Sequence, residues 1–492
     1  MDGFGFIKDI PHSDMLLFPR PPHTKIGIFI VILSMTIDQL YEIYLRHPSI
    51  QTDTRKLKNG DLFVALKGPN FNGNAFAVKA LEQGAAYAII DEAPLSENMP
   101  PSYPSDRLIV VPDALQTLQE LALHHRRQLG IPFIAITGSN GKTTTKELVH
   151  AVLASTYTTY TTVGNLNNHI GVPLTILSVQ KDAQFAVIEM GANHQKEIES
   201  YCRYTLPTHG IITNAGKAHL EGFGGPEGVK KGKGELYDFL RSGDVPPVSG
   251  VSGGTAFVMW DYDYLRDMSK GLPHIIKYGT HDADITGRID QGGQSSFLSV
   301  SITSGSATGI IHTQMVGDYN LPNVLVAVAV GQHFGVPGDR IRRSIEAYAP
   351  SNSRSQLIER DSNHIILDAY NANPSSMRAA IENFARIGTA GHPVPSVAAA
   401  SAASGGKILI LGAMAELGED SQQEHQGIVD LIGQYPWQQV LLVGGDFQRI
   451  DHPYLRFADS RAAAAWFRQA GLRNAYILIK GSRSTKMEEV LG

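Results

Sequence analysis

Cysteine is nearly absent from this chain of 492 residues, which contains only Cys202. A single cysteine cannot form an internal disulfide or a multi-cysteine metal site, so a disulfide-stabilised secreted domain and a zinc ribbon are both excluded. This composition suits the reducing cytoplasm, and we expect a cytoplasmic protein.

The chain also lacks an excess of charge of one sign. Lysine and arginine total 42, and aspartate and glutamate total 47, which gives a net charge of −5. No electrostatic footprint for a nucleic acid is present, so we expect no such partner. An anionic ligand would have to be held by a local site.

Long hydrophobic runs are missing as well. The run Ile26–Met35 is apolar, but it is shorter than the ~20 residues needed to cross a bilayer, so we expect no stable membrane insertion. A signal peptide is the alternative, yet no small-residue cleavage site follows the run. We interpret residues 1–34 as an N-terminal extension outside the fold, produced by a start codon assigned too far upstream. An amphipathic helix is predicted to begin near Met35.

The remaining composition is that of an ordinary globular protein, with 42% hydrophobic and 18% charged residues. The chain is too long for one core, and it divides into three segments, 35–127, 128–348 and 349–492. The first is a small α/β unit. In the second, strands alternate with helices, which predicts a parallel sheet with crossover helices. The third has the pattern of another open α/β sheet.

Short apolar runs define the predicted strands. In chain order they are 60–66 and 85–91 in the first segment, 132–137, 185–190 and 209–214 in the second, and 364–370, 407–414, 439–445 and 475–481 in the third. Helices are predicted at 74–85 and 145–155. Arg241–Gly254 and Thr389–Lys407 are rich in Gly, Pro, Ala and Ser, and we expect them to be mobile insertions. No solenoid-type repeat is found.

The stretch "IAITGSNGKTTTKE" (Ile134–Glu147) is the strongest local motif. A strand that delivers TGSNGKTT to a helix start places backbone N–H groups and the positive helix end around a polyphosphate. Lys142 would neutralise phosphate charge, and the Thr143 hydroxyl would contact Mg²⁺. The alternative is a plain glycine turn. The loop is shorter than the common phosphate loop, and its predicted nucleotide-binding residues are Gly138, Ser139, Asn140, Gly141, Lys142, Thr143 and Thr144.

The shortened loop resembles the ATP site of the Mur ligase family and its folylpolyglutamate synthetase relatives. Further motifs follow in the order found in that family, and "MGANH" and "YNANPSSM" are the most telling. The motifs lie at 161–177, 187–198, 213–236, 317–331, 352–356, 367–377, 411–425 and 478–483. The resemblance covers the chain from about Met35 to its C-terminus.

The resemblance implies a three-domain α/β fold: a small N-terminal α/β domain for the UDP-sugar, a central parallel-sheet, P-loop-like ATPase domain and a C-terminal Rossmann-like domain. It implies a cytoplasmic, monomeric ligase of peptidoglycan synthesis that uses ATP and Mg²⁺. The implied reaction activates the carboxylate of UDP-N-acetylmuramoyl-tripeptide as an acyl phosphate and joins it to D-alanyl-D-alanine. Phosphoryl transfer between two anions needs positioning and charge neutralisation, so the site should be rich in cations and metal ligands.

The resemblance also assigns residues to the ATP site. Glu189 ends a strand and would bind Mg²⁺, although it could be a solvated carboxylate. His219 would be a second metal ligand, although histidine is an unusual ligand for Mg²⁺ and a surface histidine is as plausible from the residues alone. Lys233 would be carbamylated; otherwise it is a solvated lysine. Asn320 and Asn323 are implied nucleotide contacts; the alternative for them is a helix cap and an exposed polar residue. Arg354 and Asp368 are also implied nucleotide contacts, and the alternative for them is a surface salt bridge.

Substrate contacts follow from the same resemblance. Thr54, Arg55, Asn72 and Asn74 resemble the UDP-sugar pocket, and a plain hairpin with an exposed arginine is the alternative. The central tripeptide-facing residues are Asn165, Asn167 and Asn168. In the last segment the dipeptide region comprises Asn371, Asn373 and Pro374.

Two positions depart from the family pattern. Ala413 stands where aspartate is common, and Ser484 stands where glycine is common, so fine contacts in the last domain are left open. Other functions also stay open at this point. They are a related ligase that adds a single amino acid, a nucleotide-hydrolysing switch or assembly module, and a non-catalytic cell-wall scaffold.

Overall fold

We analysed the protein as a computed structural model, which describes residues 35–92, 105–248, 253–290, 297–351, 353–387 and 406–492. The predicted extension 1–34 lies outside the described residues, as does nearly all of the predicted insertion 389–407. Of the other predicted insertion, the first two residues end helix α8 (Pro226–Ser242), and residues 243–247 that follow form no helix or strand.

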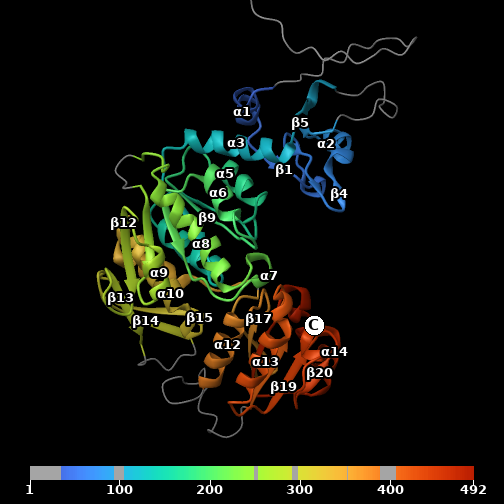
Figure 1. The fold of residues 1–492 in the computed structure, drawn as a ribbon, viewed down its shortest axis with the longest axis vertical. Coiled ribbons are helices and arrows are strands. Elements are labelled where there is room, and N and C mark those ends of the chain that lie inside the picture. Colours follow the sequence, from blue (N-terminus) through green and yellow to red (C-terminus); the bar gives the residue numbers. More distant parts are fainter. Residues whose placement is uncertain (1–34, 93–104, 249–252, 291–296, 352, 388–405) are drawn as a thin grey trace, which may run out of the picture.

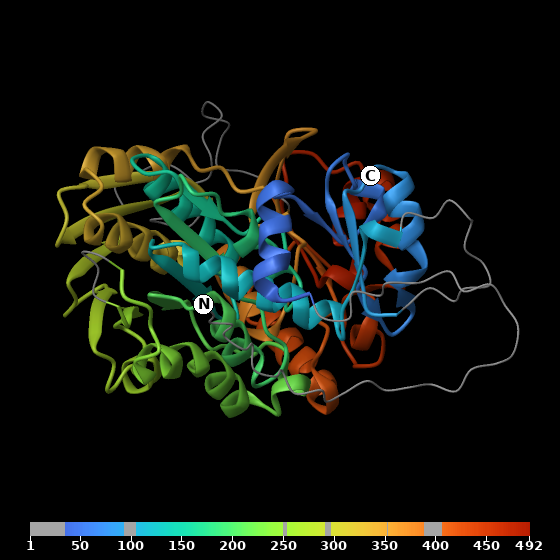
Figure 2. The same ribbon diagram turned by 90° about the horizontal axis from the view of Figure 1, so that it is seen from above.

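Three α/β units follow one another along the chain, each with its own sheet (Figures 1 and 2). The first unit has a four-stranded parallel sheet in the order β1-β2-β5-β6, with the small hairpin β3-β4 beside it. Its elements are α1 (Ile37–Arg46), β1 (Ile50–Gln51), η1 (Thr54–Lys56), β2 (Leu62–Val64), β3 (Lys67–Gly68), β4 (Phe71–Asn72), η2 (Gly73–Phe76), α2 (Ala77–Glu82), β5 (Tyr87–Ile90), η4 (Ser105–Arg107), β6 (Leu108–Val110) and α3 (Ala114–Gln128).

The predicted helix near Met35 is confirmed as α1. Thr36 and Gln39 form a reciprocal capping box at its start, which satisfies two N–H groups that have no partner inside the helix. Its apolar face is buried, and the Tyr44 hydroxyl donates to the Leu177 carbonyl of the middle unit at 2.5 Å. The helix therefore ties the first unit to the second.

The middle unit has a nine-stranded sheet in the order β15-β14-β13-β12-β11-β10-β7-β9-β8. Its strands are β7 (Phe133–Thr137), β8 (Thr159–Thr161), β9 (Phe185–Glu189), β10 (His209–Ile212), β11 (Thr255–Met259), β12 (His274–Gly279), β13 (Ile285–Ile289), β14 (Phe297–Ser304) and β15 (Ile310–Val316). Its helices and 3-10 turn are α4 (Lys142–Ala154), α5 (Gly171–Ser178), α6 (Glu197–Thr205), α7 (Leu220–Phe223), α8, α9 (Asp263–Met268), η5 (Asp318–Asn320), α10 (Leu321–His333) and α11 (Gly338–Ala347).

The expectation of a parallel sheet holds for β8 to β13 but not for β14 and β15, which pair antiparallel. Along β15 buried and exposed residues alternate, which is typical of an antiparallel strand with one solvated face. By contrast, β7, β9, β10 and β11 are buried throughout, as strands covered on both faces must be. The central strands thus read as continuous apolar runs in the sequence.

The last unit has a six-stranded sheet in the order β16-β17-β21-β18-β19-β20, parallel except at β16. Successive strand residues alternate between two apolar clusters: Leu409 packs with helices α12 and α13, while Ile408 packs with α14 and η9. The sheet is therefore covered on both faces. Its elements are β16 (Gln356–Arg360), β17 (Asn363–Asp368), α12 (Pro374–Arg386), β18 (Lys407–Gly412), η6 (Gly418–Asp420), α13 (Ser421–Ile432), β19 (Gln439–Val443), η7 (Gly445–Gln448), β20 (Leu455–Phe457), α14 (Ser460–Gln469), β21 (Tyr476–Lys480), η8 (Arg483–Thr485) and η9 (Met487–Leu491).

The only cysteine lies on α6 and is fully buried, and burial raises the pKa of the Cys202 thiol. Within the described part of the chain, no helix is both long and apolar enough to cross a bilayer.

Candidate active site

A cavity of about 810 Å³ lies at the carboxyl ends of the central strands of the middle unit, where the last unit faces them. Ligands of open α/β sheets bind at this edge. The predicted residues that line it are Ser139, Asn140, Gly141, Lys142, Thr143, Thr144, Asn165, Asn167, Asn168, Glu189, His219, Asn320, Asn323, Arg354, Asp368, Asn371 and Asn373. Residues more than two hundred positions apart in the sequence are thus brought to one site.

The loop after β7 has space only for glycine at its two ends. Gly138 has φ +144°, and a Cβ there would lie 2.0 Å from the Thr213 hydroxyl oxygen. Gly141 has φ +80°, caps helix α4, and would place a Cβ 2.8 Å from Asn323 Oδ1. The left-handed conformation and the close approach both favour glycine. The loop therefore turns tightly and opens the N-terminal end of α4 to the cavity.

Side chains from elsewhere in the middle unit and from the last unit hold this loop in place. The Asn140 N–H donates to Asn214 Oδ1 at 3.1 Å, and the Thr213 hydroxyl donates to the Asn140 carbonyl at 2.6 Å. From the last unit, Asn373 Nδ2 donates to Asn140 Oδ1 at 2.7 Å. The loop conformation is thus coupled to the position of the last unit.

Lys142 is folded back onto its own loop. Its ammonium group donates to the Gly138 carbonyl and, at 3.2 Å, to the Ser139 carbonyl. Burial, and more weakly the nearby Arg354, lower the pKa of Lys142 to about 8, while Glu189 acts in the opposite direction. A polyanion in the cavity would supply the counter-charge that this lysine lacks.

Glu189 has one satisfied and one free oxygen. Its Oε1 accepts from the Thr143 hydroxyl at 3.2 Å and from Asn167 Nδ2 at 2.7 Å, whereas buried Oε2 has no partner. A buried carboxylate oxygen without a partner is costly, and a hard divalent cation is a ligand that would satisfy it. Among the described residues no three His, Cys, Asp or Glu side chains converge as a metal cage.

Lys233 on α8 is only 1% exposed. Its ammonium nitrogen lies 3.1 Å from the Ala192 carbonyl and 4.7 Å from the centre of the Phe223 ring, and Ala192 itself lines the cavity. Burial, with repulsion from Lys142, lowers the pKa of Lys233 well below its ordinary value. The side chain is therefore not the solvated lysine that was the alternative, and its neutral amine is favoured.

His219 precedes α7 and meets the last unit. Its Nδ1 contacts the carboxylate of Glu416, which lies in the loop after β18. The histidine holds the pKa of Glu416 below its ordinary value. His219 is thus paired with a carboxylate rather than free on the surface.

The last unit contributes cations to the same cavity. Arg354 stacks on Tyr370, with its guanidinium carbon 3.5 Å from the ring centre. Lys480 forms a 2.6 Å ion pair with Asp368, whose other oxygen accepts from the Ser355 N–H at 3.2 Å. Because both oxygens of Asp368 are engaged inside the last unit, this aspartate positions Lys480.

Comparisons with known proteins agree along most of the chain. Residues 48–126 match the description "Mur ligase family, catalytic domain", residues 136–331 match "Mur ligase middle domain", and residues 353–483 match "Mur ligase, glutamate ligase domain". The chain is 31% identical over 468 residues to UDP-N-acetylmuramoyl-tripeptide–D-alanyl-D-alanine ligase of Bacillus subtilis (strain 168), covering 92% of this chain and 93% of that protein. The chain belongs to the Mur ligase family.

Further relatives support this. The Escherichia coli (strain K12) protein of the same name is 32% identical over 478 residues, covering 94% of this Mur ligase and 98% of that protein. A crystal structure of MurF from Acinetobacter baumannii, at 29% identity, superposes with a TM-score of 0.75 and covers 90% of this chain and 92% of that one. The three-domain α/β fold that the resemblance implied is confirmed.

The predicted UDP-sugar residues of this Mur ligase do not line the cavity. Arg55 is exposed and pairs with Asp53 at 2.7 Å. Asn72 and Asn74 bond to the turn after β5, where Asn74 Nδ2 donates to Asp91 Oδ1 at 2.7 Å. The two asparagines and this turn therefore form one polar surface in the first unit, and neither asparagine lines the large cavity. Thr54 begins the 3-10 turn η1.

The amides of Asn320 and Asn323 are engaged inside the protein, although both residues line the cavity. Asn323 Nδ2 donates to Asn320 Oδ1 at 2.9 Å, and its Oδ1 accepts from the Thr145 hydroxyl at 3.1 Å. Asn320 Nδ2 donates to the Val316 carbonyl at 2.9 Å. The two side chains therefore pack beneath the phosphate loop and bond to the protein itself. These internal hydrogen bonds were not predicted from the sequence, from which nucleotide contacts were expected.

Several cavity residues were not predicted from the sequence as nucleotide or catalytic groups. They are Tyr262, Tyr264, Tyr319, Tyr370, Lys480 and Arg483. Lys480 and Arg483 carried a signal, because the "LIKGSR" motif contains both. The stacked pair Tyr262 and Tyr264, with ring centres 5.6 Å apart, lies in a stretch without any recognised motif.

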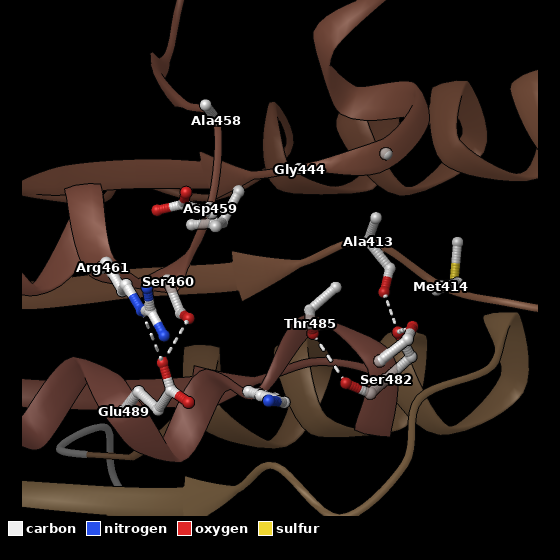
Figure 3. A pocket seen from close by; sticks show the side chains of 14 residues that line it. Ala413, Met414, Gly444, Ala458, Asp459, Ser460, Arg461, Ser482, Thr485 and Glu489 are labelled. Atoms are coloured by element: carbon white, nitrogen blue, oxygen red, sulfur yellow. Dashed lines mark hydrogen bonds and ion pairs between the residues drawn. The ribbon is translucent and has the colours of Figure 1, made fainter.

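A second cavity of about 480 Å³ lies within the last unit, beyond the ends of β18, β19 and β21 (Figure 3). The Ser482 hydroxyl donates to the Ala413 carbonyl at 2.7 Å, and Arg461 lies 3.7 Å from the Glu489 carboxylate at the other end. Ala413 and Ser484, the two departures from the family pattern, both line this cavity. The two departures therefore lie in one cavity, whose lining includes no residue of the phosphate loop.

Proposed function

We propose that this Mur ligase uses ATP and Mg²⁺ to join D-alanyl-D-alanine to UDP-N-acetylmuramoyl-tripeptide, giving the pentapeptide precursor of peptidoglycan. The curated relatives carry that activity in their names. One observation carries the proposal: a single cavity holds the shortened phosphate loop, the free oxygen of Glu189 and, facing them from another unit, Arg354 and Lys480.

The chemistry divides into two steps. The terminal carboxylate of the tripeptide attacks the γ-phosphorus of ATP, and ADP leaves, which gives an acyl phosphate. The dipeptide amine then attacks the carbonyl carbon, loses a proton and expels phosphate. In the first step the attacking carboxylate and the γ-phosphate of ATP are both negatively charged and repel each other. Cations around the transferred phosphoryl group therefore lower the barrier.

The residues have separate roles in this proposal. Lys142 and the N–H groups at the start of α4 bind the β- and γ-phosphates, and Arg354 with Lys480 adds positive charge from the opposite side. Thr143 and Glu189 hold Mg²⁺, with His219 as a further ligand, and the ion supplies charge neutralisation of the phosphates. Asn140 and Asn373 keep the last unit against the loop, which keeps water from the acyl phosphate.

Carbamylation of Lys233 is part of the proposal. A lysine reacts with CO₂ only through its neutral amine, and burial favours that form. The product is a carbamate anion in place of a cation, beside Ala192 of the cavity lining. An ammonium at this buried position, which Lys142 repels, would instead oppose metal binding.

Substrate placement completes the proposal. The first unit, 35–127, receives the UDP-sugar through Thr54, Arg55, Asn72 and Asn74, and 128–348 binds ATP. Asn165 and Asn168 face the tripeptide. In 349–492, Asn371 and Asn373 receive the dipeptide in this proposal. We propose a cytoplasmic monomer.

The test measures ADP release with UDP-N-acetylmuramoyl-tripeptide, with and without D-alanyl-D-alanine, and the mass of the product. Release that requires both substrates, with formation of the pentapeptide, supports the proposal. Equal release without the muramoyl nucleotide indicates a hydrolysing switch, and turnover with single amino acids in place of the dipeptide indicates a related ligase. Either result refutes the proposed reaction.

A further inference from the structure

The contact between His219 and Glu416 joins two units of the protein at the edge of the active-site cavity. His219 belongs to the middle unit, and Glu416 belongs to the loop between β18 and η6 of the last unit. His219 lines the cavity, and its side chain is 20% exposed. The carboxylate meets Nδ1, so Nε2 is the nitrogen left to bind another group.

Both partners have an uncommon backbone. His219 has φ +52° and Glu416 has φ +62°, whereas residues other than glycine seldom adopt the left-handed region. Such conformations persist only where the surrounding structure determines them, and they gather at functional sites. Two such residues meet here across the boundary between the units, so the packing on both sides determines the geometry of the contact.

Hydrogen bonds within the last unit hold the loop that carries Glu416 in place. Buried His425 on α13 accepts the Met414 N–H at its Nε2 at 3.0 Å, while its Nδ1 bonds to the Ser421 carbonyl at 2.7 Å. Leu417 is buried next to Glu416. The carboxylate is thus presented outward from a fixed loop.

Neighbouring contacts hold the two units together at this place. Lys217 forms a 2.5 Å ion pair with Glu424, and its N–H donates to the Ser375 hydroxyl at 2.9 Å. Gly418 lies so close to Glu221 that an added Cβ would be 3.2 Å from the Glu221 Cβ. Glu416 therefore reaches His219 only when the last unit is packed against the middle one.

We propose that Glu416 is the positioning residue of His219. As the acceptor of a hydrogen bond from the Nδ1–H group, the carboxylate fixes the neutral tautomer in which Nε2 has the free electron pair. A ligating histidine commonly has its other nitrogen bonded to a carboxylate in this way. Because the carboxylate comes from the last unit, the imidazole is made ready for a divalent cation by domain packing. This inference rests on the proposed role of His219 as a metal ligand.

The test uses full-length protein, Mn²⁺ as the probe and a non-hydrolysable ATP analogue, with bound Mn²⁺ counted by electron paramagnetic resonance. The tautomer of His219 is read from ¹⁵N chemical shifts, and its signals are assigned by their loss in His219→Gln. Glu416→Ala is compared with Glu416→Gln, which keeps an acceptor oxygen, and with Glu419→Ala, which removes an exposed carboxylate from the adjoining 3-10 turn η6.

We expect Glu416→Ala to weaken Mn²⁺ binding by about 10-fold or more and to release the proton from Nδ1. Glu416→Gln should keep the tautomer and most of the affinity, and Glu419→Ala should match the wild type. Unchanged affinity, or an unchanged tautomer, in Glu416→Ala overturns the inference. If His219→Gln itself binds Mn²⁺ normally, the proposed metal role of His219 fails, and the inference fails with it.

Discussion

The affinity for ATP should depend on pH through Lys142. Its pKa is lowered to about 8 because the side chain is buried and has no carboxylate partner at bonding distance. A bound polyphosphate would stabilise the ammonium form and raise the pKa again. Binding is therefore coupled to proton uptake, so it should be strong below pH 8 and should weaken as the pH rises through 8.

The size of the effect follows from the titration. With a pKa of about 8 in the free protein, the ammonium form falls from roughly 90% at pH 7 to roughly 10% at pH 9, so the dissociation constant should rise about tenfold over that range. At pH 8 about half a proton should be taken up for each nucleotide bound.

The measurement is calorimetric titration with a non-hydrolysable ATP analogue in buffers of different ionisation enthalpy, at pH 7, 8 and 9. Lys142→Arg is the matched control, because arginine keeps its charge throughout and reports the titration of the nucleotide alone. If wild type and Lys142→Arg show the same pH dependence, or if no proton is taken up at pH 8 beyond that of the control, the reasoning about Lys142 is wrong.

Three further predictions concern other parts of the site. Lys233→Ala should lose about 100-fold or more of its activity and regain part of it with added formate or acetate; a variant that does not respond to small carboxylates would argue against carbamylation. Gly138→Ala should lower the free energy of unfolding, measured by denaturant titration, by about 1–3 kcal/mol. The reason is that the added Cβ would lie 2.0 Å from the Thr213 hydroxyl oxygen. The control is Gly427→Ala on α13, which has no atom within 4 Å of the added Cβ and should not destabilise the protein. Lys217→Glu should raise the KM for ATP by about 2–5-fold, because the partly exposed ion pair with Glu424 contributes ~0.2–1 kcal/mol. Adding Glu424→Lys should restore the KM. A double variant whose KM is no lower than that of Lys217→Glu would show that the pair does not hold the units together.

The fold was predictable where apolar runs are buried on both faces. Strands β7, β9 and β10 are such runs, so their positions could be seen directly in the sequence. Strands β8 and β11 to β15 were not predicted, although β11 is itself an apolar run that is buried throughout. For β14 and β15, an alternating pattern with polar residues does not fix whether a strand continues a parallel sheet or reverses it. Their pairing depends on partners that only the tertiary structure brings together.

The candidate site was predictable to the extent that its residues lie in local motifs. Gly138, Lys142 and Glu189 lie at strand ends or a helix start, where the local pattern itself indicates the role. The pairs Asn140–Asn373 and His219–Glu416 could not be found in this way, since each joins distant parts of the chain. The roles assigned to the individual site residues stay predictions until the experiments above are done.

The enclosed thiol on α6 has a practical consequence. Cys202 is sealed in the protein interior, and its raised pKa disfavours the thiolate, which is the reactive form. Thiol-directed dyes should therefore leave the native protein unlabelled and react only with cysteines introduced at exposed positions, such as Lys231 in the middle unit and Gln448 in the last unit. Fluorescence energy transfer between two such labels could then follow the approach of the two units in real time, without replacing any native residue of the interior.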